Sequence, residues 1–506
     1  MERRKPSLGL AILVFIAAAA MIAATVLVWE VDIHITLVLS ALVAGTIGIL
    51  FLKYDYESIE KGIIEGIMTG MQACLILYTV GPLVGTWIVS GVVPSMIYYG
   101  LSILSPSIFL LATLIICTIV ALATGTSWGT AGTVGIALMG IAIGLGIPAP
   151  LTAGIIISGG YCGDKMSPLS DTTNLAPAVA GTDLFQHIRA MCWTTIPTYI
   201  IVAVITLVLG FGYAGGELDT GKIAAMQALM DAEFWISPIA FIAPAVVIAL
   251  SAMGKPALPS LYAGIFVAAG FAAFQGIGIG EILNIMQYGY VPTISADIAG
   301  AGEDAAALAK VLADNAITIE PKIALEAAND IVKLMERGGL QSMNWTISLI
   351  ICAFTFGSTM EVCGFLKVML EAIMKPIKSV GGMVTATLIS CFVCDLFLGD
   401  QYLSIAMPGR MFKSAFDEKG LHPRMLSRTL EDAGTLVSVL IPWNTCGAYH
   451  SGVLGVSTFE YAPYAFLNYL NPIIASAMTF MGIGIFWRGK DGEPVHGGKT
   501  RPENLK

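Results

Sequence analysis

Residues 159–181, GGYCGDKMSPLSDTTNLAPAVAG, place a row of polar side chains between two apolar runs. Carboxylate, hydroxyl and backbone carbonyl oxygens are the ligands that a hard cation requires. Pro168 lies midway, where it interrupts a helix and frees backbone carbonyls. The stretch therefore predicts a cation site built where a helix unwinds at membrane depth. Its candidate ligands are Asp164, Ser167, Ser170, Asp171, Thr172, Thr173 and Asn174.

The two carboxylates of this stretch are also candidates for proton coupling. An ionisable residue inside a membrane is a functional candidate by default. Asp164 and Asp171 are two helical turns apart, but the break at Pro168 prevents them from sharing one helix face. A buried carboxyl group that holds either a proton or a cation makes the two compete, and that competition is antiport. The structural alternative for Asp164 is an ion pair with the adjacent Lys165.

Polar residues interrupt three further apolar regions. The alternatives are a hydrogen-bonded core carboxyl for Asp395 and helix caps for Asn444 and Thr445. Glu361 and Asp432 rank lower, because both are expected at span ends facing the cytoplasm. The additional binding candidates are Thr126, Ser127, Thr130, Asp400, Gln401, Asn444 and Thr445. The proton-linked candidates are Asp164, Asp171, Asp395 and Asp400, and the strongest candidates for direct ligands of the cation are Asp171, Asn174 and Asp400.

Composition identifies the setting of these residues. The chain has 506 residues, of which 56% are hydrophobic and 12% charged, and its mean hydropathy is +0.81. Soluble domains carry about 25% charged residues. Apolar runs of about 20 residues are long enough to span a bilayer. The sequence predicts an all-α polytopic membrane protein. It contains no P-loop and no catalytic triad, and its basic residues form no patch, so we expect neither an enzyme, a cofactor nor a nucleic-acid partner.

The apolar runs give an expected order of spans. We expect continuous spans at 8–29, 33–52, 62–90, 187–212, 232–252, 257–280, 341–362 and 462–487. The regions 105–146, 150–181, 380–416 and 426–456 are apolar but interrupted. The stretch 281–340 is expected to form a solvated external cap, in which the pattern of 303–339 predicts two short helices broken at Pro321. Suppose that 105–146 and 380–416 are re-entrant hairpins and that 150–181 and 426–456 are full crossings broken midway. Then 20 of the 26 Lys and Arg residues, Lys255 among them, fall on the cytoplasmic side with both termini. Charge alone does not distinguish such hairpins from full crossings.

The two halves of the chain match when Gly399 is aligned on Gly125. In the same register, Gly146, Gly160, Pro168 and Gly181 coincide with Gly420, Gly434, Pro442 and Gly455. With the expected topology, the second half is inverted relative to the first, which is typical of secondary transporters. The alternative is a set of packing kinks. The expected divisions are 1–60 (two N-terminal helices), 61–213 (repeat 1), 214–280 (linking helices), 281–340 (external insertion), 341–490 (inverted repeat 2) and 491–506 (cytoplasmic tail).

Several blocks carry a family resemblance. "GDKMSPLSDTTNLAPA" resembles the signature of NhaC-type Na+/H+ antiporters, and "TGTSWGTAGT", "CDLFLGDQYLSIAMPGRMF" and "VLIPWNTCGAYHSGVLGV" look like that family's other strong blocks. The resemblance implies the fold of the ion transporter superfamily: inverted repeats, each with a re-entrant hairpin and a discontinuous transmembrane helix, in a homodimer in the cell membrane.

The resemblance leaves two functions open. The first is exchange of Na+ for H+ by alternating access. The second is a Na+/H+-coupled exchange of organic anions of the malate or lactate type, which the family also contains. An anion needs positive groups, and the half-helix N-termini near Ser170 and Thr445, together with Lys165 and Arg410, are candidates. A passive channel or a membrane enzyme is the least favoured function.

Overall fold

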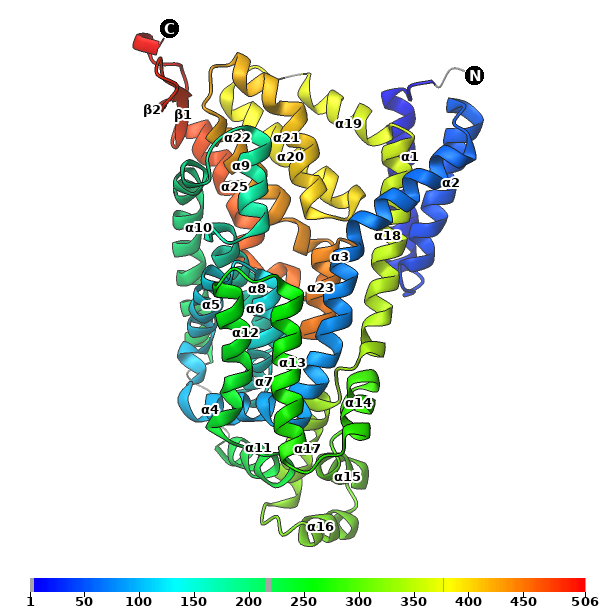
Figure 1. The fold of residues 1–506 in the computed structure, drawn as a ribbon, viewed down its shortest axis with the longest axis vertical. Helices are drawn as coiled ribbons and strands as arrows, with labels where there is room; N and C mark the ends of the chain where they lie inside the picture. The colour runs from blue at the N-terminus through cyan, green and yellow to red at the C-terminus, as the bar shows by residue number, and fades with distance from the viewer. Residues whose placement is uncertain (1–3, 214–219, 376, 506) are drawn as a thin grey trace.

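The computed structural model describes residues 4–213, 220–375 and 377–505. Helices make up nearly all of this part of the chain, and one antiparallel pair of strands, β1 (Ile485–Arg488) and β2 (Pro494–Gly497), lies near the C-terminus. Within the described ranges, nine helices are long and apolar enough to cross a bilayer. The protein is therefore an all-helical, multi-pass membrane protein. Both termini lie at the same end of the molecule (Figure 1).

The first half begins with two peripheral helices and continues into a long helix with several short ones. The helices are α1 (Leu8–Leu27), α2 (His34–Leu52), α3 (Tyr56–Val89), α4 (Val92–Ile103), α5 (Pro106–Thr124), α6 (Ser127–Thr130), α7 (Ile136–Gly144), α8 (Ala149–Met166), α9 (Asp171–Ala180) and α10 (Leu184–Gly212). Residues Ala131–Gly135 form a π-helical turn between α6 and α7. The α3 helix starts before the expected span because Asp55 caps it, accepting a hydrogen bond from the Ser58 N–H at 2.8 Å.

The second half reproduces these boundaries. Its helices are α18 (Asn344–Val362), α19 (Phe365–Met374), α20 (Val380–Leu398), α21 (Gln401–Glu418), α22 (Pro423–Leu430), α23 (Thr445–Leu454), α24 (Thr458–Tyr461) and α25 (Phe466–Met481). In the register that aligns Gly399 on Gly125, α20 covers the same positions as α5, and α23 covers the same positions as α9. Residues 423–440, which are α22 and two short turns, likewise cover the positions of α8. The register that matched the glycines therefore also matches the helix boundaries.

The corresponding helices enter from opposite ends of the molecule. In Figure 1, α4 lies near the lower end and α19 near the upper end, and the hairpins that follow them reach toward the middle. Each hairpin turns at a glycine in the left-handed region, with φ +69° at Gly125 and +67° at Gly399. A residue without a Cβ adopts this conformation at little cost. The breaks between α8 and α9 and before α23 fall at Pro168 and Pro442, as the sequence predicts.

The segment between the two halves differs from expectation. Residues 232–252 do not form one span, because a 3-10 turn at Pro238–Phe241 separates α11 (Thr220–Glu233) from α12 (Ile242–Ala252), and the two segments meet at 86°. Pro238 cannot continue the preceding helix. The α12 helix pairs with α13 (Ala257–Phe274), and α13 packs along α3. The tip between α12 and α13 stands near mid-height in Figure 1.

The two short helices expected in 303–339 are present as α16 (Ala305–Asp314) and α17 (Pro321–Met335), and Pro321 begins the second of them. The rest of the insertion adds two helices that were not expected, α14 (Ile279–Tyr288) and α15 (Ile294–Ala301). The last span ends at Met481, short of 487, because Gly482 and Gly484 adopt positive φ and the chain then enters β1.

Candidate functional site

The tips of the two hairpins carry equivalent helix caps. The Thr126 hydroxyl accepts a hydrogen bond from the Gly129 N–H at 3.1 Å and caps α6. At the equivalent position, the Asp400 carboxylate accepts hydrogen bonds from the N–H groups of Tyr402 (2.9 Å) and Leu403 (3.1 Å) and caps α21. The two tips therefore have the same capped backbone conformation, but only the second tip is capped by an acidic side chain.

The two helix breaks are capped in the same manner. Ser170 caps α9 by accepting a hydrogen bond from the Thr173 N–H at 3.4 Å, and Asn444 caps α23 by accepting one from the Cys446 N–H at 3.1 Å. The next residues are Asp171 and Thr445, so here the first half carries the charge. The Thr445 N–H donates to the Gly399 carbonyl at 2.8 Å, which places the start of α23 beside the second hairpin tip.

The far ends of these half-helices each contact a basic residue. The Lys413 ammonium donates to the carbonyl of Val179 near the end of α9 at 3.5 Å. The Arg337 guanidinium donates to the carbonyl of Leu454 at the end of α23, also at 3.5 Å. Cations are favourable at helix C-termini, where the carbonyls have no helical partner.

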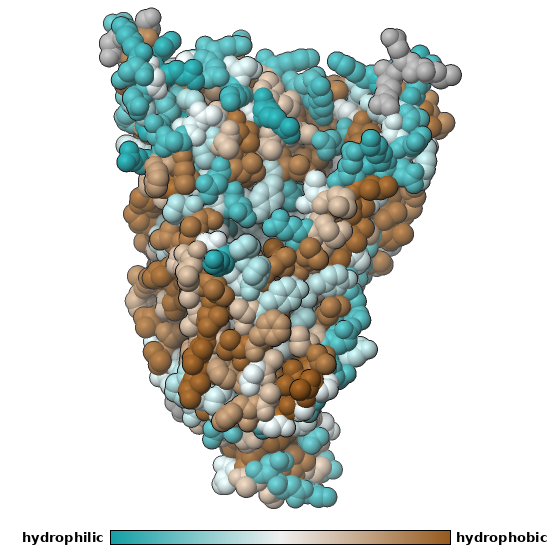
Figure 2. Space-filling model, in the orientation of Figure 1, coloured by the Kyte–Doolittle hydropathy of each residue, from teal (hydrophilic) through white to brown (hydrophobic). Residues whose placement is uncertain are grey.

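A cavity of about 430 Å³ opens where the tips and breaks meet. Eight of the predicted residues line it: Thr126, Asp164, Ser170, Asp171, Thr172, Asp400, Gln401 and Thr445. It is also lined by α3 and by the α12–α13 tip, which the sequence did not implicate, through Thr69, Gln72, Ser251 and Lys255. In Figure 2, hydrophilic residues run from the upper rim to the middle of one face, between two hydrophobic flanks.

The two acids of the opening stretch have different surroundings. Asp164 is buried, and its Oδ2 accepts hydrogen bonds from the Ser127 N–H (2.9 Å) and hydroxyl (2.7 Å). It therefore ties the end of α8 to the first hairpin tip. Asp171 is exposed to the cavity, and within the described residues its carboxylate has no hydrogen-bond or ion-pair partner.

Three other predicted ligands of the first break lie outside the cavity lining and stabilise the break itself. The Ser167 hydroxyl donates to the carbonyl of Leu122 at 2.8 Å. The Thr173 hydroxyl donates to the carbonyl of Lys165 at 3.1 Å. The Asn174 amide donates to the carbonyl of Ser170 at 2.7 Å.

Predicted residues of the second half and of the first hairpin also serve the framework. Asp395 is fully buried behind the cavity, and the Asn444 amide donates to its Oδ1 at 3.3 Å and to its carbonyl at 3.1 Å. The Thr130 hydroxyl donates to the carbonyl of Thr126 at 2.9 Å. These side chains hold the second break and the first hairpin in place.

An aromatic contact connects the two halves next to the cavity. The rings of Trp128 and Tyr449 stack with their centroids 4.1 Å apart, and the Tyr449 hydroxyl donates to the Trp128 carbonyl at 2.8 Å. Sequence reasoning missed this pair, because nothing in the local pattern of α6 or α23 indicates the other helix as its partner.

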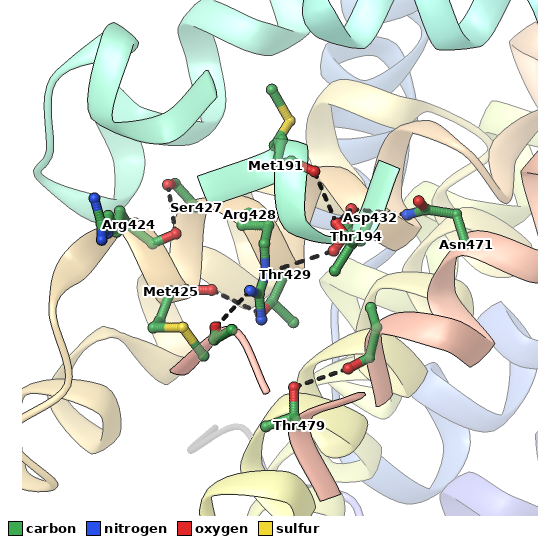
Figure 3. A network of polar contacts seen from close by, with 12 residues as sticks. Met191, Thr194, Arg424, Met425, Ser427, Arg428, Thr429, Asp432, Asn471 and Thr479 are labelled. Carbon is green, nitrogen blue, oxygen red and sulfur yellow. Dashed lines mark hydrogen bonds and ion pairs between the residues drawn. The ribbon is translucent and has the colours of Figure 1, made fainter. Parts of the chain in front are cut away.

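A buried polar network lies behind the first break. The Lys165 ammonium contacts Oδ1 of Asp432 at 2.7 Å, and both side chains are fully buried. The same oxygen accepts from Asn471 (2.8 Å) and Thr194 (3.1 Å), as part of the network in Figure 3 shows. This geometry excludes the structural alternative for Asp164, because Lys165 pairs with Asp432 instead. It also corrects one expectation, since Asp432 lies in the core rather than at a span end facing the cytoplasm. Arg410, the other candidate anion ligand, does not line the cavity.

These features define a class of protein. Carboxylates, hydroxyls and helix ends converge on a polar cavity inside a membrane-spanning helical fold, which suits solute binding and transport rather than a covalent reaction. The Na+/H+ antiporter family model matches residues 3–173 and 161–483, and the chain belongs to that family. It is therefore a secondary antiporter of the NhaC type and not an enzyme.

Relatives of known name have different substrates. The chain is 36% identical over 485 residues to the Na(+)/H(+) antiporter NhaC of Alkalihalophilus pseudofirmus, covering 95% of this chain and 97% of the relative. It is 38% identical to the malate-2H(+)/Na(+)-lactate antiporter of Bacillus subtilis, covering 96% and 97%. It is 34% identical to the arginine/ornithine antiporter ArcD of Halobacterium salinarum, covering 98% and 96%. Sequence similarity over the whole chain therefore identifies the protein as an antiporter but does not identify its substrate.

Proposed function

We propose that the protein exchanges Na+ for H+ across the cell membrane by alternating access. The observation that carries this proposal is the carboxylate of Asp171, which faces the cavity without a partner in the described structure. An unpaired carboxylate among hydroxyl groups suits a monovalent cation, because one negative charge balances it and neutral oxygens complete its coordination.

Each nearby side chain has a proposed part in the exchange. Asp171 binds Na+ directly, with hydroxyl oxygens such as those of Thr172 and Thr126 available beside it. Asp164 or Asp400 shares the proton-linked charge, since both line the same cavity. Na+ and H+ then compete for one set of carboxylates, and this competition couples entry of one ion to exit of the other.

The repeated architecture supports alternating access. We propose that the halves form inverted repeats, with re-entrant hairpins at α5–α7 and α20–α21 and discontinuous helices at α8–α9 and α22–α23. The common register of the two halves and the opposite directions of entry in Figure 1 support this interpretation. Repeats of this kind exchange conformations around a fixed central site. Both termini then face the cytoplasm, and the homodimer expected from the resemblance stays a prediction.

A second candidate function is Na+/H+-coupled exchange of an organic acid. The volume of the cavity favours it, because about 430 Å³ falls within the range of small-molecule sites. The relatives named for malate, lactate, arginine and ornithine exchange support the same candidate, since all four solutes carry a carboxylate.

Transport in reconstituted vesicles separates these functions. Purified protein is placed in proteoliposomes with an imposed pH gradient, and uptake of radioactive Na+ is measured with and without malate or lactate. Na+ uptake that needs only the pH gradient supports the first function. Na+ movement that requires the organic acid supports the second, and no movement of either solute contradicts both.

A further inference from the structure

The cavity is lined by two chemically different sets of side chains. The broken helices and the second hairpin contribute the acids Asp164, Asp171 and Asp400. The α3 helix and the α12–α13 hairpin, of which only the hairpin lies outside the expected repeats, contribute hydrogen-bonding groups and one basic residue, Lys255. Among the described residues that line the cavity, Lys255 is the only lysine or arginine.

The backbone of the α12–α13 tip fixes the position of Lys255. The α12 helix ends with Gly254 in the left-handed conformation, at φ +72°. The Gly254 N–H bonds to the Ser251 carbonyl at 2.9 Å, and the Lys255 N–H bonds to the Leu250 carbonyl at 3.0 Å. These two bonds form a Schellman motif, which closes a helix end with a defined geometry. Lys255 is therefore presented by an ordered turn.

The hairpin itself is anchored in the helical framework. The α13 helix packs along α3, and the Trp87 indole N–H donates to the Gly264 carbonyl at 3.3 Å. A Cβ at Gly264 would come within 2.5 Å of Val247, so glycine permits the close approach of α12 and α13. The tip is thus held at the level of the Gly125 and Asp400 turns, with which it shares the cavity.

The Lys255 ammonium is available for a ligand. No acidic group of the described chain lies within ion-pair distance of it, and no hydrogen bond from it is found there. The Lys255 ammonium cannot coordinate Na+, because it has no lone pair, but it can pair with the carboxylate of a solute. The volume of about 430 Å³ also exceeds by far the ~30 Å³ of one water molecule.

We propose that Lys255 binds the carboxylate of a small organic substrate while the acidic residues hold the coupling cation. Thr69, Gln72 and Ser251 are placed to hydrogen-bond other polar groups of the solute. Lys255 is then a specificity-determining residue, contributed by a hairpin rather than by the repeats. This inference rests on the proposed function only in taking the cavity as the transport site.

The test compares three variants of the full chain in proteoliposomes. Lys255→Gln keeps a polar side chain but removes its charge, Lys255→Arg keeps the charge, and Lys367→Gln removes an exposed charge on α19 as a matched control. Uptake of labelled acetate, lactate, succinate and alanine is measured under a Na+ gradient. Proton movement driven by Na+ without any organic solute is measured in parallel.

We expect wild type to take up at least one of these acids, and an excess of the corresponding carboxamide not to compete. Lys255→Gln should raise the apparent KM for that acid at least tenfold, while Lys255→Arg stays within threefold and Lys367→Gln matches wild type. Retained Na+-driven proton movement in Lys255→Gln shows that the variant is folded.

Two results overturn the inference without touching ion exchange. One is an unchanged KM for the acid in Lys255→Gln. The other is wild-type protein that exchanges Na+ for H+ but takes up none of the four solutes. Wild-type protein that moves neither ions nor acids contradicts the proposed function itself, and this inference with it.

Discussion

Asp164 and Asp171 lie on either side of the Pro168 break, yet their contacts suit different tasks. Asp164 accepts two hydrogen bonds from Ser127, so any change in its charge alters the link between α8 and the first hairpin tip. Asp171 has no such link and can exchange its ligand without breaking a protein contact. We infer that Asp171 exchanges the ion and that Asp164 transmits occupancy to the hairpin.

Replacement of Asp171 by Asn tests the ligand. Asn keeps the shape but removes the charge, so exchange should be abolished, whereas Glu361→Gln should reduce it only modestly, because Glu361 lies at the exposed end of α18. In wild type, raising the pH from 6 to 9 should lower the apparent KM for Na+, because fewer protons then compete with Na+ for the cavity. Proton movement in proteoliposomes measures both. If the Asp171→Asn protein is active with the wild-type pH profile, Asp171 is not the direct Na+ ligand, and Asp400 becomes the candidate.

Removal of one partner of the Lys165–Asp432 pair should destabilise the protein. Both side chains are fully buried 2.7 Å apart, and a lone buried charge costs about 3–5 kcal/mol. Asp432→Asn should therefore lower Tm in detergent by several degrees. Asp432 also lies 3.7 Å from the buried Nε of Arg428, so the single variant Lys165→Met should lose less, because Arg428 still compensates the carboxylate. Equal losses in Lys165→Met and Asp432→Asn would show that packing rather than charge pairing determines stability here.

At the scale of elements, each hairpin turn combines a left-handed glycine with a capping side chain. The two turns differ in what surrounds the glycine. A Cβ at Gly125 would lie 2.7 Å from both the backbone and side chain of Leu169, whereas one at Gly399 would meet its nearest atoms at 3.5 Å. The first turn is thus pressed against the first helix break, and the second is not.

This difference predicts unequal effects of alanine at the two glycines. Both substitutions place a Cβ at positive φ, which costs about 1 kcal/mol, but only Gly125→Ala also displaces Leu169 next to the site. Gly125→Ala should therefore slow Na+-driven proton movement more than Gly399→Ala, with both proteins present in the membrane. Gly399→Leu should stop transport through its bulk. Wild-type rates in both alanine variants would mean that neither turn is tightly packed around the site.

Elements governed by local chemistry were predictable from the sequence. Pro168 and Pro442 mark the breaks, and Ser170 and Asn444 carry capping side chains, so the local pattern alone was enough to place helix ends and half-helix starts. The position of Lys255 could not be predicted, because a lysine beside Pro256 between two apolar runs also fits an ordinary loop. Its place in the cavity depends on the packing of α13 against α3, and the Lys165–Asp432 pair depends on a contact between residues far apart in the chain.

At the scale of the whole molecule, the helical insertion and the two termini lie at opposite ends (Figure 1). We expect the insertion 281–340 on the external side, and Lys419 and the tail after Arg488 in the cytoplasm. Single cysteines introduced at Lys310 and Lys419 should react with a membrane-impermeant reagent from opposite sides of intact cells and inverted vesicles. Labelling of both positions from the same side would remove the support for inverted repeats.

The directions of the half-helices α9 and α23 affect how the protein responds to the membrane potential. If the halves are inverted repeats as proposed, the two half-helices run in opposite directions from the cavity, to Val179 beside Lys413 and to Leu454 beside Arg337. Their dipoles then oppose each other across the bilayer and largely cancel. A potential of 100 mV performs about 2.3 kcal/mol of work on each elementary charge that crosses. The membrane potential therefore does work mainly on the transported ions and on the carboxylates that move with them. The voltage dependence of the exchange rate thus measures the net charge moved in each cycle.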